Sequence, residues 1–239
     1  MVNSNYILSQ HQHRPWSLPD KPFIYYQEWY NTMFLHFSIT PSGVLPFIPK
    51  FLELDIFNGK AWVSLVAFTV KRLKPRLLPP FPLLSNFNEV NIRTYVTAEA
   101  KPGIYFIDIR ADKMLSLKLT KFVTSLPYQQ AKINREKDCY FLTAENYLLN
   151  TNYSLQSAIN SKTDLDKWLT ERYCLYFDKK NNLYRYQIHH PEWKLKNLDV
   201  SEIQLSFTKN NVYLKEEDVY STHFSEFQPV LIWPREKLI

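Results

Sequence analysis

Glycine is scarce in this sequence, with only three among 239 residues. Gly43, Gly59 and Gly103 stand far apart, so no two of them can belong to one loop. Loops that hold phosphate groups need clustered glycines, because side chains would keep the backbone amides away from the ligand. The sequence therefore excludes a P-loop nucleotide site and a dinucleotide-binding Rossmann motif, and we predict no cofactor.

Cysteines and long hydrophobic segments are also few. Cys139 and Cys174 have neither CxxC nor metal-ligand spacing, which is typical of free thiols in a reducing compartment. The best apolar run, residues 61–68, is soon followed by Lys71 and is too short to span a membrane. Residues 1–13 lack the apolar centre of a signal peptide. A cytoplasmic protein without a membrane partner is the default expectation.

The charges of the chain are nearly balanced. Lys and Arg number 29 against 23 Asp and Glu, and the two signs are interleaved along the chain. Only the proline-rich segment 71–84 gathers basic residues, which is weak evidence for a nucleic-acid partner. Hydrophobic residues make up 45% of the sequence, enough for a substantial core. We predict a flexible tail over residues 1–13 and a single domain over residues 14–239.

Strand patterns dominate the chain. Alternating or aromatic-rich runs predict strands at residues 23–37, 52–57, 61–70, 89–97, 104–110, 128–135, 140–149, 172–177, 183–189, 203–207, 212–214 and 227–233. Run 61–70 is apolar on both faces, which predicts burial on both sides. Asn58-Gly59 suits a type I′ hairpin turn, and residues 101–103 predict another turn.

Helical signals are shorter than the strand signals. They occur at Thr40-Pro41, over residues 112–125, and after Thr163, where Asp166 completes a capping box. The predicted fold class is therefore mainly β (α+β), with many antiparallel strands and two or three short helices.

The candidate site is a polar row on the predicted strand 89–97. Glu89, Asn91, Arg93 and Tyr95 alternate with apolar residues, so their side chains point to one face. Such a row can orient a small polar ligand, with Arg93 gripping a carboxylate or phosphate and Glu89 acting as acid or base. The same alternation is the ordinary pattern of a strand with one face in water, and both interpretations stay open here.

Other polar residues give weaker indications of a site. His189 and His190 are adjacent on a strand, so their side chains point to opposite faces and rarely share a metal ion, and His223 has no supporting ligand spacing. We therefore predict no metal site. His36 lies in an aromatic strand and is interpreted as a hydrogen-bonded core histidine. Arg172 either pairs with a buried carboxylate, pairs with exposed carbonyl groups at the end of the helix, or borders a cavity.

Several phrases, in order from about Arg14 to the C-terminus, resemble one family. They are Arg14-Pro15-Trp16-x-Leu18-Pro19, Gln27-x-Trp29, Leu35-His36-Phe37, Asp55-x-Phe57-x-Gly59-Lys60-Ala61-Trp62-Val63, Phe87-x-Glu89-Val90-Asn91-Ile92-Arg93-Thr94-Tyr95-Val96, Gly103-Ile104-Tyr105-Phe106, Leu126-Pro127-Tyr128, Glu171-Arg172-Tyr173 and Ile232-Trp233-Pro234. The sequence looks like the YqjF-like group, a bacterial family of unknown function. The resemblance implies a fold similar to acetoacetate decarboxylase: an antiparallel β-barrel or cone with helices outside and a cavity within.

The resemblance also bears on the chemistry. Acetoacetate decarboxylases carry a Pro-Lys-Lys phrase, in which one lysine forms a Schiff base and the other lowers its pKa. The comparable phrase here, Pro127-Tyr128-Gln129, has no lysine, so Schiff-base decarboxylation is not expected. The resemblance matches Glu89 to the glutamate that lines that family's site. Arg110 stands where the YqjF-like pattern usually has an acid.

Two functions follow from the sequence. The first is binding of a small polar carboxylate or carbonyl compound in a barrel cavity, with acid–base chemistry as an option. Its predicted residues are Glu89 as acid or base, and Asn91, Arg93, Tyr95, Tyr128 and Trp29 as ligand-binding residues. The alternative is a non-enzymatic regulatory or protein-interaction domain whose polar row is exposed. The sequence leaves open whether the protein is an enzyme, and it gives no oligomeric state.

Overall fold

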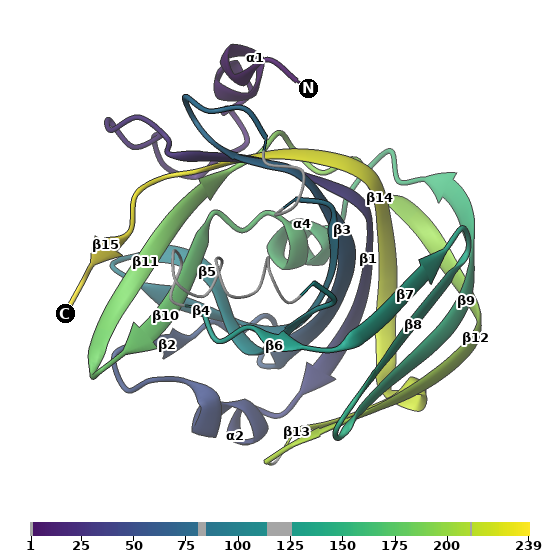
Figure 1. The fold of residues 1–239 in the computed structure, drawn as a ribbon. Helices are drawn as coiled ribbons and strands as arrows, with labels where there is room; N and C mark the ends of the chain where they lie inside the picture. Colours follow the sequence, from purple (N-terminus) through teal and green to yellow (C-terminus); the bar gives the residue numbers. More distant parts are fainter. Residues whose placement is uncertain (1, 81–84, 114–125, 211) are drawn as a thin grey trace.

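Strands make up most of the computed structural model, which describes residues 2–80, 85–113, 126–210 and 212–239 (Figure 1). The strands are β1 (Tyr25–Ile39), β2 (Glu53–Leu54), β3 (Ala61–Pro75), β4 (Phe87–Ala98), β5 (Lys101–Ala111), β6 (Gln129–Gln130), β7 (Lys132–Glu136), β8 (Cys139–Ala144), β9 (Tyr147–Ala158), β10 (Cys174–Lys179), β11 (Asn182–His189), β12 (Lys196–Lys209), β13 (Val212–Lys215), β14 (Val219–Ile232) and β15 (Glu236–Lys237). The mainly β fold class predicted from the sequence is confirmed.

Helices are short and few in the described residues. They are α1 (Ser4–Ser9), α2 (Pro41–Val44) and α4 (Asp164–Thr170), with 3-10 turns η1 (Leu45–Phe47) and η2 (Glu216–Asp218). None of the helices in this part of the chain has the length and apolar character needed to cross a membrane.

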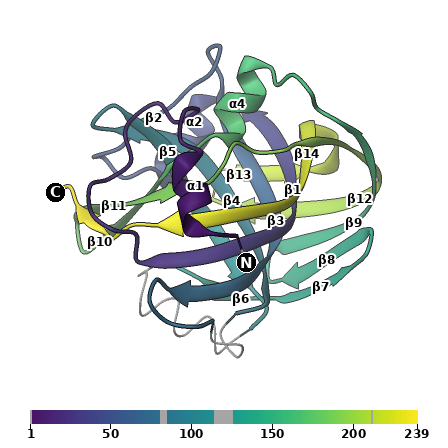
Figure 2. The ribbon, with the colours of Figure 1, turned by 90° about the horizontal axis from the view of Figure 1, so that it is seen from above.

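Seven strands close into a ring. They pair in the order β14, β1, β3, β4, β5, β10 and β11, and β11 pairs again with β14 where Ile188 lies opposite Ile232. Figure 1 views the ring end-on, with β11 at its left and α4 drawn within its outline, and the turned view of Figure 2 shows that α4 lies at one end of the ring. One pair, β5 with β10, is parallel. The antiparallel ring expected from the resemblance therefore contains one parallel pair, because the chain crosses over between these two strands.

A second layer covers the outside of the ring. Strands β12, β9, β8 and β7 continue the sheet from β14 and lie against β1, β3 and β4, on the right of Figure 1. From β3, Leu65 packs outward with Leu142 and Leu149, whereas Val66 and Phe68 belong to the cluster inside the ring. Strand β3 is thus buried on both faces, as its apolar run predicted.

The Asn58-Gly59 turn has the predicted conformation, but the segments on its two sides do not pair with each other as a hairpin. The two residues have φ angles of 49° and 75°, as a type I′ turn requires. The segment before the turn forms only the short strand β2, which pairs with β4. The predicted hairpin between residues 52–57 and β3 is therefore reduced to a single bridge from Phe57 to Lys60.

Two other turns differ from the sequence prediction. The chain reverses at Glu99 and Ala100, whose φ angles are 50° and 56°, and residues 101–103 already belong to β5. The predicted strand 140–149 is two strands, β8 and β9, with a turn at Asn146, whose φ angle is 59°. Apolar residues continue on both sides of these short turns, so periodicity alone does not reveal them.

Residues 1–13, for which the sequence predicts a flexible tail, include a short helix. Residues Ser4–Ser9 form α1, and Ile7 is completely buried in a cluster with Phe23, Leu231 and Trp233. Val2 and Leu8 also pack against this cluster, so a few apolar residues anchor the segment although its overall composition is polar.

The capping box that opens α4 is present as predicted. The Thr163 hydroxyl accepts from the Asp166 amide, and the Asp166 carboxylate accepts from the Thr163 amide. Thr40 and Pro41 also open α2, as predicted. The helix predicted over residues 112–125 lies outside the described residues from position 114 onward.

Candidate functional site

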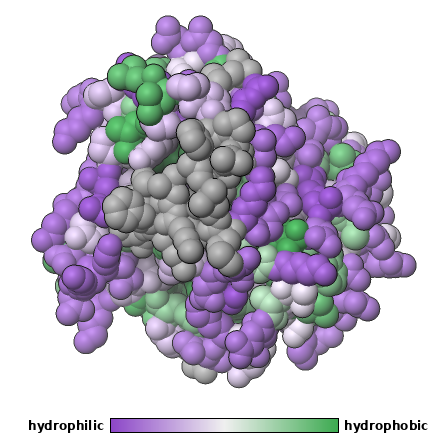
Figure 3. Space-filling view, in the orientation of Figure 1, coloured by the Kyte–Doolittle hydropathy of each residue, from purple (hydrophilic) through white to green (hydrophobic). Residues whose placement is uncertain are grey.

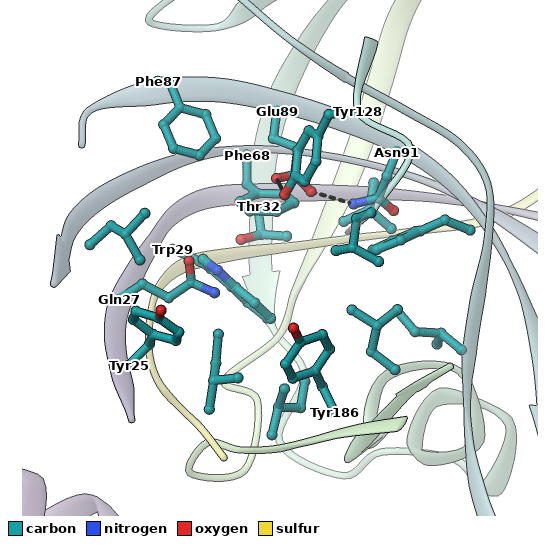
Figure 4. Close-up of a pocket in the computed structure, with 18 of the residues that line it drawn as sticks. Tyr25, Gln27, Trp29, Thr32, Phe68, Phe87, Glu89, Asn91, Tyr128 and Tyr186 are labelled. Atoms are coloured by element: carbon teal, nitrogen blue, oxygen red, sulfur yellow. Dashed lines mark hydrogen bonds between the residues drawn. The ribbon is translucent and has the colours of Figure 1, made fainter. Parts of the chain in front are cut away.

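The ring encloses a cavity of about 590 Å³, a volume typical of small-molecule sites (Figure 4). Side chains from all seven ring strands line it, together with residues that follow β3 and residues that precede β6 and β12. Most of the wall is aromatic or aliphatic. Polar side chains on the wall come from β4, from β1, from the segment before β6 and, with Tyr186, from β11.

The polar row on β4 faces this cavity. Glu89, Asn91 and Arg93 line it and are only 4%, 3% and 7% exposed. The row is not a solvated strand face, because the ring curves that face inward. Tyr95, the fourth residue of the row, is fully buried beyond the cavity wall, where its hydroxyl donates to the Leu169 carbonyl at 3.1 Å.

Glu89 is a buried carboxyl group held by two donors. The Tyr128 hydroxyl donates to its Oε2 at 2.8 Å, and Asn91 Nδ2 donates to its Oε1 at 3.0 Å. Burial raises the pKa of Glu89 to about 7, because the loss of solvation outweighs these two hydrogen bonds. Burial likewise raises the pKa of Tyr128 well above its usual value. A carboxyl group with a pKa near neutral can act as either an acid or a base.

Arg93 is a buried cation with little compensation. One guanidinium nitrogen donates to the Leu169 carbonyl at 3.3 Å, and the group lies 5.6 Å from the centre of the Phe34 ring. In the described part of the chain Arg93 has no carboxylate partner, and its Nε has no hydrogen-bond acceptor. A buried charge without a counter-charge is costly, so the site favours an anion beside Arg93.

Four more polar atoms on the wall are buried without a partner among the described residues. They are Asn91 Oδ1, Thr32 Oγ1 and the indole nitrogens of Trp29 and Trp193. Each unpaired group of this kind costs about 1–3 kcal/mol, which a ligand with matching polar atoms would recover. Hydrogen-bond donors predominate in the set, so the matching ligand atoms are acceptors.

Of the wall residues predicted from the sequence, Trp29 and Tyr128 line the cavity and Tyr95 does not. Thr32 and Trp193 also line it and were missed. Thr32 escaped because the pairing of β1 with β3 shifts register between Tyr30 and Met33. Before the shift the odd-numbered residues of β1 face the cavity, and after it the even-numbered residues do. The irregularity is visible in the backbone at Asn31, whose φ angle is positive, 51°.

A buried polar chain runs beside the cavity. His36 Nδ1 contacts Ser64 Oγ at 2.6 Å, and His36 Nε2 contacts His223 Nδ1 at 3.0 Å. His223 Nε2 then contacts the Asp166 carboxylate on α4 at 3.0 Å. Burial, with His223 and Arg93 nearby, holds the pKa of His36 well below its usual value. His36 is thus a hydrogen-bonded core histidine, as interpreted from the sequence.

Two arginines singled out from the sequence have structural partners. Arg172 donates to Asp55 Oδ2 at 2.5 Å and does not line the cavity. Arg110 donates to the buried Asp108 at 2.7 Å, so the basic residue at this position compensates an acid two residues away. Across the residues the structure describes, no group of three His, Cys, Asp or Glu side chains is arranged to hold a metal ion.

Comparison with known sequences identifies relatives of this chain. Residues 26–228 match the family model DUF2071, described as an uncharacterized conserved protein. A protein of Bacillus subtilis (strain 168), the uncharacterized protein YqjF, is 35% identical over 235 residues, which cover 92% of this chain and 95% of that protein. The resemblance to the YqjF-like group is confirmed.

Solved structures with the same fold include two kinds of protein. Acetoacetate decarboxylase from Legionella pneumophila superposes with a TM-score of 0.62 at 15% identity, covering 100% of this chain and 98% of that one. The enduracididine biosynthesis enzyme MppR, complexed with pyruvate, superposes with a TM-score of 0.63 at 12% identity, covering 94% and 93%. At this identity the likeness shows the fold alone, and it agrees with the acetoacetate decarboxylase-like architecture expected from the resemblance.

Proposed function

The chain belongs to the DUF2071 family of uncharacterised conserved proteins, and we propose that it binds an organic acid or carbonyl compound in the ring cavity. Arg93 holds the anionic or carbonyl oxygen of the ligand, and Glu89 exchanges a proton with it. One observation carries the proposal: a buried carboxyl group and a buried guanidinium line the same cavity without pairing with each other.

The two side chains have complementary chemistry. A guanidinium forms two parallel hydrogen bonds to a carboxylate, which fixes the orientation of the ligand as well as its charge. Glu89, with a pKa of about 7, is present in both protonation states at neutral pH. Tyr128 and Asn91 hold its carboxyl group in one orientation, which general acid–base chemistry requires.

The proposal involves no covalent lysine. The described wall residues include Arg93 as a cation and no lysine, and Tyr128 points its hydroxyl at Glu89 from the phrase Pro127-Tyr128-Gln129. In this proposal the ligand is held by hydrogen bonds and charge, and Glu89 supplies proton transfer.

A protein-interaction domain is less well supported. It would require the polar row on an outer surface, whereas Glu89, Asn91 and Arg93 are buried. Among the coloured residues in Figure 3, hydrophilic side chains separate the apolar ones on this face, so the drawn surface offers no broad apolar docking area.

Binding measurements on single variants test the proposal. Pyruvate, acetoacetate and octanoate are titrated calorimetrically into the wild type, Glu89→Gln and Arg93→Gln at about pH 6 and about pH 8. We expect Arg93→Gln to weaken binding at least about tenfold, the loss of one charge-assisted pair. Wild-type affinity for the anion should fall as the pH rises and Glu89 ionises, whereas Glu89→Gln should show no such fall.

The controls are exposed residues of the same types. Glu145→Gln and Arg235→Gln remove a carboxylate and a guanidinium that do not line the cavity, and both should bind as the wild type does. The proposal is wrong if none of the three acids binds, or if the Glu89 and Arg93 variants match these controls.

A further inference from the structure

Most of the cavity wall is apolar, and the acid–base chemistry proposed above does not use it. Beyond the polar row, the apolar part of the wall includes Leu73, Pro75, Phe87, Leu175, Ile188 and Ile232. These residues come from β3, β4, β10, β11 and β14, so the apolar lining extends around most of the ring. A ligand of three or four carbons would leave this lining in contact with water or empty space, and neither is favourable.

Arg93, the cation among the described wall residues, marks where an anionic end of the ligand would bind. Arg93 supplies the charge, and its Nε is buried without an acceptor among the described residues. Thr32, 1% exposed and also unpaired, and the unpaired indole nitrogen of Trp193 add neutral donors elsewhere on the lining of the same cavity. A carboxylate satisfies a guanidinium and such donors together, because each of its oxygens accepts more than one hydrogen bond.

The apolar lining also continues to the surface of the protein. Leu78 lines the cavity and is 58% exposed, and Pro79 beside it lines the cavity as well. Leu73 and Pro75 connect this edge to the interior along β3. An apolar chain can therefore contact protein from the surface to the polar row.

We infer that the ligand is an amphipathic carboxylic acid, with its carboxylate at Arg93 and a medium-length alkyl or aryl body along the apolar wall. This inference rests on the function proposed above and adds the class of ligand. It differs from binding of a short oxo acid, which would use the polar row alone. The cavity volume of about 590 Å³ accommodates such a molecule.

A chain-length series tests the class of ligand on the wild-type protein. Butanoate, hexanoate, octanoate and decanoate are titrated calorimetrically below the concentrations at which they form micelles, and octan-1-ol is titrated as the uncharged counterpart. Each added methylene that becomes buried should strengthen binding up to about fourfold. We expect decanoate to bind at least about 100-fold more tightly than butanoate, and octanoate to bind more tightly than octan-1-ol.

Each outcome of the series has a distinct meaning. Equal affinities for butanoate and decanoate would overturn the amphipathic ligand while leaving an acid-binding cavity in place. Octan-1-ol binding as tightly as octanoate, in both wild type and Arg93→Gln, would overturn the role of Arg93 and with it the proposed function. Failure of every acid to bind would overturn both.

A matched pair of variants locates the alkyl body. Leu73→Trp places a larger side chain on the apolar wall and so reduces the space in the cavity. Leu77→Trp adds the same bulk at a side chain that is 90% exposed and does not line the cavity. We expect Leu73→Trp to weaken decanoate binding at least about tenfold while butanoate binding stays within twofold, and Leu77→Trp to change neither. Unchanged decanoate binding by Leu73→Trp would place the body elsewhere and contradict the inference.

Discussion

At the scale of single residues, Glu89 shows what strand alternation can and cannot predict. The alternation of β4 placed Glu89, Asn91 and Arg93 on one face, and the three side chains do share a face. The same pattern fits a strand with that face in water, because periodicity records only which residues are neighbours. Burial of Glu89 depends on strands far away in the sequence, and burial is what raises its pKa.

The raised pKa of Glu89 predicts how its replacement changes stability with pH. Folding raises this pKa from 4.5 to about 7, so the native protein keeps a proton that the unfolded chain releases. The contribution of Glu89 to stability is therefore present below about pH 4.5 and is lost as the pH rises through about 7. Glu89→Gln stays neutral and avoids this loss.

Urea unfolding of both proteins measures the effect. Relative to the wild type, Glu89→Gln should gain about 2 kcal/mol more unfolding free energy at about pH 8 than at about pH 5. The exposed control Glu145→Gln should stay within about 0.5 kcal/mol of the wild type at both pH values. A constant difference between Glu89→Gln and the wild type across this range would show that Glu89 is not buried in the way described.

At the scale of secondary-structure elements, most strands were predicted correctly as strands. The errors arose at short irregularities, such as turns and register shifts. The capping box of α4 and the turn at Asn58-Gly59 follow from local residue chemistry, and both are present. The register shift in β1 near Asn31 is also local, yet a shift of one residue moves every later side chain of the strand to the opposite face of the sheet. Thr32 was missed for this reason.

Gly103 in β5 illustrates a residue whose role depends on another element. Its position suggested a turn, but it lies within β5 beside the parallel strand β10. A Cβ atom there would stand 2.5 Å from the Cys174 carbonyl oxygen and 2.7 Å from the Cys174 Cβ. Only glycine permits this close approach, which joins β10 to the ring.

Gly103→Ala should consequently destabilise the ring. We expect a loss of about 2 kcal/mol of unfolding free energy, within the usual cost of overpacking, measured by urea unfolding. The matched control Gly43→Ala should change stability by less than about 1 kcal/mol, because the nearest obstacle is a methyl group of Ile39 at 3.1 Å and alanine favours a helix. Equal effects of the two substitutions would contradict this account of the β5–β10 contact.

At the scale of the whole molecule, the cavity exists because the sheet closes on itself. Closure needs the pairing of β11 with β14 and of β5 with β10, and neither pair is joined by a short turn. Sequence periodicity does not encode such pairings, so a ring with a cavity was expected only from the family resemblance. The second layer, from β7 to β12, buries the outer face of β3 and explains why that strand is apolar on both sides.

The central claim, that the cavity holds an organic acid between Arg93 and the apolar wall, is tested most directly by a crystal structure with 10-bromodecanoate. Anomalous scattering from bromine locates the end of the alkyl chain independently of the carboxylate. We predict the carboxylate within hydrogen-bond distance of the Arg93 guanidinium and the bromine among Leu73, Pro75 and Leu78. An acid bound outside the ring, or one inside it with bromine at Arg93 and its carboxylate at the apolar wall, would contradict the account.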